Sequence, residues 1–395
     1  MIASLEELLE QHAWAALRIS GADQTAWNGE IVEAGEGILG LAHWDGTLHL
    51  DREYILDPLR DLYDRADEPR TEAELLRCRE ALVTLLHEQS HFLGPAGATQ
   101  EAARAAFKLP GGRALEEGVA EAWAHHHLND YIRELGIDKV APGILHVRGE
   151  PSYAAFVPAV RLFAADLDRL SGAPAGETLD LLNRQTAEGQ WHQAVTRIYH
   201  STQLPHLVPP DQAPAVRLHL EQALRSSFKA LELYEPLPRG FAASRSQAAT
   251  TRTLTLLHQE LATAERHYTP APRLSRIHLS PPPMPTTPLR PIPPTAPQSR
   301  PTPPPISIAS SQAVPSPLSA SPNLTAPAAP MGDPATPAGT SASTHRLSPA
   351  DSYQAAAHAF DGISPPTAST PAPPPAAIRA TASAGTATSV RDLER

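Results

Sequence analysis

The chain has 395 residues, of which 32 are Lys or Arg and 43 are Asp or Glu, and its formal net charge at pH 7 is −11. An acidic chain without a cluster of basic residues binds nucleic acids and anionic membrane surfaces poorly, because contacts between basic side chains and phosphates supply most of the binding affinity. A single cysteine, Cys78, excludes an intramolecular disulfide and any cysteine-rich zinc site.

The first segment, residues 4–17, predicts an amphipathic helix with Ser4 as its N-cap and Glu7 three residues later. This start is acidic and lacks the basic and apolar regions of a secretory signal, and no apolar run in the chain reaches the length of a membrane span. We therefore expect a cytoplasmic protein with no membrane partner. Export by a signal-independent route would leave no trace in the sequence.

A hairpin is predicted next. Residues 38–44 and 47–50 flank Asp45-Gly46, a pair that favours a two-residue turn between antiparallel strands. The sequence therefore predicts a small antiparallel sheet ahead of the following helix.

The segment 71–93 has helical spacing of its leucines and carries an H-E-x-x-H motif at residues 87–91. Residues four apart lie on one face of a helix, so His87 and His91 can present imidazole nitrogens to one metal ion. Glu88 is adjacent, where its carboxylate can accept a proton from water at the metal. The alternative is a buried helix with two structural histidines.

Catalytic zinc takes three protein ligands, and the segment 115–124 offers the carboxylates of Glu116, Glu117 and Glu121. Together with the motif before it, this segment resembles the gluzincins, the thermolysin-like clan of H-E-x-x-H zinc metallopeptidases, whose second helix carries a glutamate ligand in a pattern close to E-G-x-A-E. The resemblance covers residues 82–124.

The resemblance implies that Glu117 is the third zinc ligand. It also implies that Glu121 hydrogen-bonds a ligand histidine, which would fix the tautomer and direction of that ring. Glu116 is a competing ligand, although it projects about 100° away from Glu117 on the same helix. The alternative is that all three carboxylates form a solvated acidic face.

Two further residues are candidates for binding the substrate or the oxyanion of a tetrahedral intermediate. His125 lies four residues after Glu121, near the same helical face, and Tyr153 follows this helix. Arg148 is a similar donor. The alternative is that His125 packs or titrates at the surface.

Beyond residue 155, helical periodicity marks the segments 156–171, 178–187, 190–201, 213–234 and 246–266. Of the 43 prolines, 29 lie from Pro270 onward, in a stretch almost free of large apolar residues, which predicts disorder from residue 268. Its polyproline segments suit either a spacer or docking to a proline-recognising partner, and residues 350–360 predict a short interaction helix.

The predicted fold class is α+β and predominantly helical. It comprises a zincin-like domain over residues 1–150 with a small antiparallel sheet, a helical subdomain over 151–267, and a disordered tail over 268–395. The predicted function is a zinc-dependent metallopeptidase acting on a peptide or protein substrate. The alternatives are a zincin-like scaffold, with a structural or vestigial metal site and a docking tail, and hydrolysis of a non-peptide substrate at the same centre.

Overall fold

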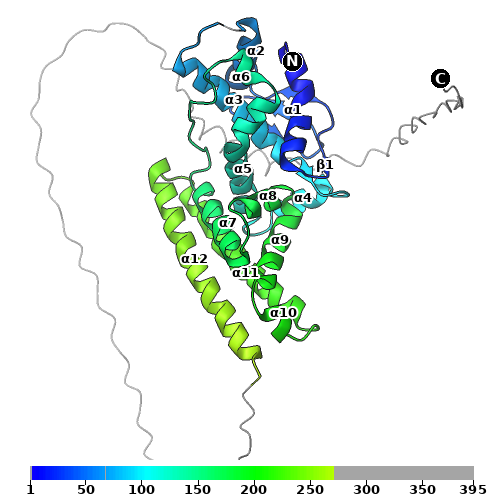
Figure 1. The fold of residues 1–395 in the computed structure, drawn as a ribbon, viewed down its shortest axis with the longest axis vertical. Coiled ribbons are helices and arrows are strands. Elements are labelled where there is room, and N and C mark those ends of the chain that lie inside the picture. Colours follow the sequence, from blue (N-terminus) through cyan, green and yellow to red (C-terminus); the bar gives the residue numbers. More distant parts are fainter. Residues whose placement is uncertain (1, 67, 271–395) are drawn as a thin grey trace, which may run out of the picture. The chain divides into compact units, whose positions relative to one another are not determined.

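The computed structural model describes residues 2–66 and 68–270, which are mostly helical with a small β component (Figure 1). The first helices are α1 (Leu5–Ser20), η1 (Arg52–Leu56), α2 (Asp57–Asp64), α3 (Glu72–Ser90), α4 (Gln100–Phe107), α5 (Gly112–Glu134) and α6 (Ile137–Val140). The later ones are α7 (Val157–Ser171), α8 (Glu177–Asn183), α9 (Ala187–His200), α10 (Leu204–Leu207), α11 (Ala213–Lys229), η2 (Ala230–Tyr234) and α12 (Arg239–Tyr268).

The predicted disordered tail lies, from residue 271 on, outside the described residues, and so does the predicted helix at 350–360. None of the described helices combines the length and the apolar character that crossing a membrane requires.

Helix α1 begins at the predicted cap. Ser4 has extended backbone angles, and its hydroxyl accepts a hydrogen bond from the Glu7 N–H at 3.2 Å. The helix continues past the predicted end at Leu17 because Gly21, with φ of 66°, supplies the left-handed residue that closes it.

The β component differs from the prediction in topology. The predicted hairpin forms, with β3 (Gly40–Ala42) antiparallel to β4 (Leu48–Leu50). The predicted two-residue turn was wrong, because His43 lies opposite Thr47 and the loop therefore has three residues, the last of which is Gly46 with φ of 91°. However, β2 (Ile31–Glu33) pairs with β4 in parallel, so this sheet is mixed and not purely antiparallel as predicted. Strand β2 is short and largely exposed, so it lacks the alternating apolar pattern that would have marked it. The strand order β2-β4-β3 leaves β3 at an edge.

A second, two-stranded sheet pairs β1 (Gln24–Thr25) with β5 (Leu93–Gly94). The prediction of a helix as far as residue 93 was wrong, since α3 ends at Ser90 and the next residues turn into this strand. The start of α3 has the full capping box, in which the Thr71 hydroxyl accepts from the Glu74 N–H and the Glu74 carboxylate accepts from the Thr71 N–H.

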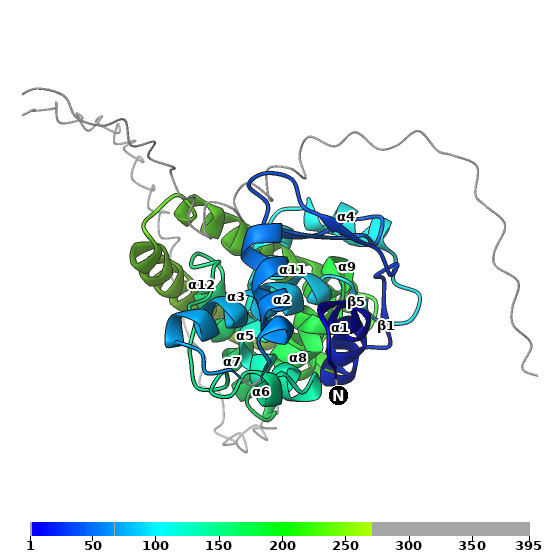
Figure 2. The same cartoon turned by 90° about the horizontal axis from the view of Figure 1, so that it is seen from above.

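Helices α3 and α5 pack against each other, as both views show (Figures 1 and 2). Every residue from Ala81 to Ser90 is buried, and so is every residue from Ala114 to Ala124. These stretches are therefore enclosed on all sides, which is unusual for segments that contain several charged residues.

The helices after α6 surround α5 and complete its burial. Helices α7, α8, α9 and α11 all contact α5, and α12 packs along α7. Gly118 permits the approach of α7, because a Cβ at this position would lie 2.5 Å from Val160 Cγ2. One hydrophobic core runs from Leu5 to Leu261. Because two subdomains can share a core, the division at residue 150 stays a prediction.

Three of the five helices predicted beyond residue 155 match α7, α9 and α11 closely, although the last turn of the segment 213–234 is the separate 3-10 helix η2. The segment 178–187 matches α8 only as far as Asn183, and Ala187 already belongs to α9. The fifth, predicted from residue 246, begins at Arg239 directly after Pro238. Its first turns are missed because they are exposed and carry little apolar periodicity.

Candidate metal centre

The packing of α3 on α5 brings together three side chains that the sequence singled out. His87 Nε2 lies 3.1 Å from His91 Nε2 and 3.4 Å from Glu117 Oε2. His91 Nε2 lies 3.6 Å from the same Glu117 oxygen. A tetrahedral zinc ion with bonds of about 2.0–2.1 Å holds its ligand atoms about 3.3–3.4 Å apart. The triangle formed by these atoms therefore has the size that one such ion requires.

Each imidazole is oriented by a carboxylate on α5. His87 Nδ1 lies 2.8 Å from Glu121 Oε2, and His91 Nδ1 is hydrogen-bonded to Glu116 Oε1 at 3.0 Å. A carboxylate beside each Nδ1 favours the tautomer in which both Nε2 atoms carry lone pairs and face each other. Two facing lone pairs repel unless a proton or a cation lies between them.

The role of Glu116 was missed in the sequence, where it was weighed only as a competing ligand. The angular offset between neighbouring helical residues directs Glu117 to the Nε2 atoms and Glu116 to the outer nitrogen of His91. The sequence did contain a signal for this role. Two metal-binding histidines each need a carboxylate or carbonyl to orient the ring, and two adjacent glutamates were present. The alternative of a solvated acidic face was wrong, since Glu116, Glu117 and Glu121 are 6%, 4% and 1% exposed.

The charges at this centre suit a cation. Glu117 Oε2 is a buried oxygen that faces the Nε2 atoms of both imidazoles, at 3.4 and 3.6 Å. Burial alone would raise the pKa of Glu117, but the neighbouring His87 and His91 outweigh it and lower the pKa to about 2. Although burial opposes protonation of His87, the carboxylates of Glu117 and Glu121 raise its pKa well above the usual value. The residues present therefore fit a divalent metal ion.

Glu88 is held beside this triangle by the edge of the sheet. Its Oε2 accepts a hydrogen bond from the Ala42 N–H of β3 at 2.8 Å, and Gly40 leaves room for its carboxylate. Burial is the main cause that raises the pKa of Glu88. A carboxyl group with a raised pKa is suited to exchange protons near neutral pH.

Glu88 is also a possible ligand by distance, since one of its oxygens lies within 4.8 Å of ligand atoms of His87 and His91. Glu117 is the better ligand, because its oxygen lies within 3.6 Å of both Nε2 atoms. Glu88 instead has a backbone partner that turns it toward β3.

The interior residues of the motif support the helix end. Gln89 Nε2 donates to His12 Nε2 of α1 at 2.9 Å, while the Nδ1–H of His12 donates to the Leu9 carbonyl. Burial lowers the pKa of His12 to about 4, so it stays neutral and serves as an acceptor. The Ser90 hydroxyl donates to the His87 carbonyl at 2.7 Å. These bonds tie the end of α3 to α1 and to its own backbone.

A cavity of about 20 Å³ adjoins the candidate ligands, with room for about one water molecule. Apart from the four motif and ligand side chains, it is lined by Gly40, Leu41, Ala42, Trp44, Phe107 and Tyr153. The rings of Trp44 and Phe107 make an edge-to-face contact with centroids 5.7 Å apart. The centre is therefore nearly closed, and the apolar pair formed by Trp44 and Phe107 makes part of the closure.

The two candidates for contact with a substrate lie in different places. Tyr153 lines the small cavity, with its ring stacked on His87 at a centroid distance of 5.5 Å. His125 Nε2 lies 3.2 Å from the second oxygen of Glu121 and lines a larger cavity, together with Arg148. The backbone N–H of Ser152 donates to that same oxygen. Glu121 thus connects the metal centre with the larger cavity.

Arg113, one turn before Glu117, was not singled out in the sequence. Its guanidinium forms two hydrogen bonds with the Glu235 carboxylate, at 2.8 and 2.6 Å, and its positive charge contributes to the low pKa of Glu117. The sequence could not predict the pairing of Arg113 with Glu235, because the two residues are 122 positions apart and are brought together only by the packing of the later helices.

Comparison with known proteins adds no relative to this description: no family model, no curated protein and no solved structure matches the chain.

Proposed function

We propose that this chain is a zinc-dependent metallopeptidase with a zincin-like, gluzincin-type centre. The single observation that carries the proposal is the triangle of His87 Nε2, His91 Nε2 and Glu117 Oε2, with sides of 3.1, 3.4 and 3.6 Å. It is supported by a carboxylate behind each histidine and by the separate carboxylate of Glu88 beside them.

In this proposal, His87, His91 and Glu117 hold the ion, and Glu121 and Glu116 keep the two rings in position. Zinc supplies a Lewis acid that polarises the scissile carbonyl and makes a water molecule more acidic. The carboxylate of Glu88 accepts the proton of the attacking water and passes it to the leaving amine. The raised pKa of Glu88 makes its carboxylate a stronger base for the first of these transfers. Strand β3 lies at an edge of its sheet, but its residues are buried and its Ala42 N–H is bonded to Glu88, so an extended peptide would have to displace this bond in order to pair with β3.

The test is the variant Glu88→Gln, compared with Glu72→Gln at an exposed position on the same helix. Cleavage of a mixed peptide library is followed by mass spectrometry, and bound zinc by atomic absorption. We expect Glu88→Gln to lose at least about 10³-fold in turnover and to retain one zinc per chain, because removal of a general base slows the chemical step without removing a ligand. Turnover at the wild-type rate in Glu88→Gln, with zinc bound, would refute the proposed role of Glu88.

A second candidate function is a scaffold in which the metal is structural. The burial of the centre favours the scaffold, because it leaves little room for a substrate. His87, Glu88 and Glu117 are 1%, 4% and 4% exposed, and the adjoining cavity holds about one water molecule. This candidate predicts one zinc per chain, cleavage of no peptide in the library, and a large loss of thermal stability on chelation. Cleavage by the wild type that Glu88→Gln abolishes would exclude it.

A further inference from the structure

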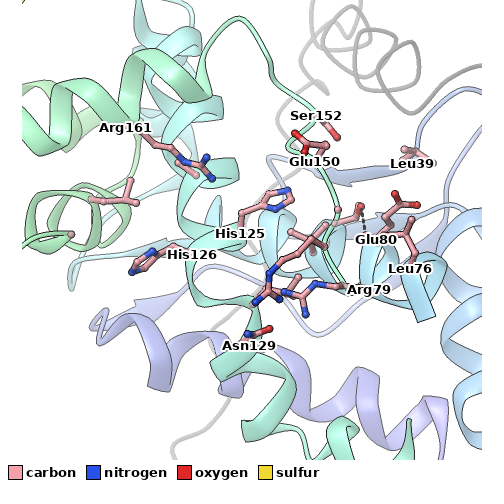
Figure 3. Close-up of a pocket in the computed structure, with 18 of the residues that line it drawn as sticks. Leu39, Leu76, Arg79, Glu80, His125, His126, Asn129, Glu150, Ser152 and Arg161 are labelled. Carbon is pink, nitrogen blue, oxygen red and sulfur yellow. Dashed lines mark hydrogen bonds between the residues drawn. The ribbon is translucent and has the colours of Figure 1, made fainter. Parts of the chain in front are cut away.

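Figure 3 shows a second cavity, of about 1310 Å³. Two of its lining residues, His125 and Ser152, contact Glu121 of the candidate metal centre. The cavity is bounded by α3, α5, α7 and the segment 148–152, and it is larger than the roughly 300–1,000 Å³ of a typical small-molecule site. None of the residues of the proposed catalytic centre lines it. The cavity therefore has the size of a separate ligand site.

The lining of this cavity is divided between apolar and cationic side chains. Its large apolar residues are Leu39, Ile55, Leu76, Val83, Leu128 and Leu179. Its six arginines are Arg77, Arg79, Arg148, Arg161, Arg169 and Arg239. Its four acidic residues are Glu53, Glu80, Glu150 and Asp168. An excess of arginines is notable in a chain whose formal net charge is −11.

Arg79 is the most informative of these residues. Its side chain comes from α3, the residue is only 5% exposed, and its Nη1 donates to the Ile144 carbonyl at 3.1 Å. Among the described residues it has no carboxylate partner. Burial, assisted by the nearby charge of Arg148, lowers the pKa of Arg79 to about 10, so the group is still a cation at neutral pH. A buried cation without a counter-ion is costly, and a bound anion would remove that cost.

Two neighbouring arginines add positive charge to the cavity and so favour a bound anion further. Arg148 and Arg161 likewise have no ion-pair partner in the described part of the chain. In Figure 3, Arg161 extends from α7 toward His125 on α5. The acidic residues offset these charges only in part. Asp168 is engaged by the backbone N–H groups of Gly176 and Thr178, each at 2.8 Å, and burial raises the pKa of Glu80.

We propose that this cavity binds an anionic amphiphile. A carboxylate or phosphate group of the ligand pairs with Arg79, Arg148 and Arg161, and its apolar body lies against the leucine-rich wall. Guanidinium groups match both anions because their planar N–H pairs can form two parallel hydrogen bonds. The proposal does not depend on peptidase activity, since no metal ligand takes part.

The test uses three ten-carbon probes, decanoate, decyl phosphate and decanol, titrated calorimetrically into the full chain as purified. We expect at least one anionic probe to bind at least tenfold more tightly than decanol, and the order of decanoate and decyl phosphate identifies the preferred head group. Equal binding of all three probes, or binding of none, would overturn the proposal.

Variants then locate the binding. We expect Arg79→Met to lose at least tenfold in affinity for the anionic probe and to leave decanol binding unchanged. Arg133→Met, at an exposed position on α5 outside the cavity, is the matched control and should bind as the wild type does. A probe held by the metal centre instead would keep its affinity in Arg79→Met, and that result contradicts the proposal.

Arg161→Met is a second variant for the case in which Arg79→Met does not fold. Arg161 is exposed, so its replacement leaves the core intact. Should Arg79→Met fail to fold by circular dichroism, a several-fold loss of affinity for the anionic probe in Arg161→Met supports the site. Wild-type affinity in Arg161→Met under those conditions refutes it.

Discussion

The candidate metal centre and the arginine-lined cavity both include residues of α3 and α5, but their buried charges have different partners. At the centre, the outer nitrogens of His87 and His91 face Glu121 and Glu116 across the interface. In the cavity, eight residues earlier on α3, Arg79 is buried without a carboxylate partner among the described residues. Burial alone therefore does not distinguish a structural charge from a functional one. The partners of each buried charge make that distinction.

Replacing one buried charge in each region by methionine gives the largest contrast. Glu121→Met removes the carboxylate that pairs with His87 and His125 and that accepts from the Ser152 N–H, and we expect a loss of about 3–5 kcal/mol in the free energy of unfolding. Arg79→Met removes a charge that has no carboxylate partner and should cost nothing or stabilise slightly. Urea denaturation of both variants measures the difference. Equal losses would show that the two regions do not differ in this way.

A methyl group added at the edge of the centre tests its tight packing. A Cβ at residue 40 would lie 2.7 Å from Glu88 Oε1 and 2.9 Å from Thr84 Cγ2, so Gly40→Ala must displace the proposed base. We expect turnover to fall by about 10²-fold with zinc still bound, because small misplacements of a reacting group are costly. Gly35→Ala is the control, since no atom lies within 4 Å of its added methyl. Undiminished turnover in Gly40→Ala would argue that Glu88 is not the base.

The orienting carboxylate that the sequence did not reveal can be tested by zinc affinity. Glu116→Gln weakens the acceptor for the His91 Nδ1–H, and we expect zinc binding to fall by roughly 10–100-fold in competition with a chelator. Glu101→Gln, at an exposed position on α4, should leave the affinity unchanged. If both variants bind zinc equally well, Glu116 contributes only to packing.

The pH dependence separates the two regions further. Carboxylates raise the pKa of His87 and of His91, so protons compete with zinc. As the pH falls through these raised values, which lie above the usual 6.5, the apparent zinc affinity should fall by about tenfold per pH unit for each proton displaced. Decanoate binding at Arg79 should stay level from pH 8 to pH 6, since the pKa of Arg79 is about 10. Zinc affinity that is flat over this range would contradict the assigned histidine ligands.

Local patterns account for most of the helices and for half of the centre. The Ser4 cap, the Thr71 start of α3 and the H-E-x-x-H spacing are all properties of neighbouring residues, and each is visible without knowing the fold. The mixed sheet was not predicted, because the parallel pairing of β2 with β4 depends on contacts between segments that the chain order does not join directly.

The sequence alone determined that His87 and His91 share one helical face with Glu88 next to them, because helical periodicity is a short-range property. Only the tertiary structure decided which glutamate of α5 faces the Nε2 atoms and which one orients His91, since that depends on the rotation of α5 against α3. It alone also decided that Arg79 is buried without a carboxylate partner in the described residues, because the partners of a buried charge are set by every element that packs around it.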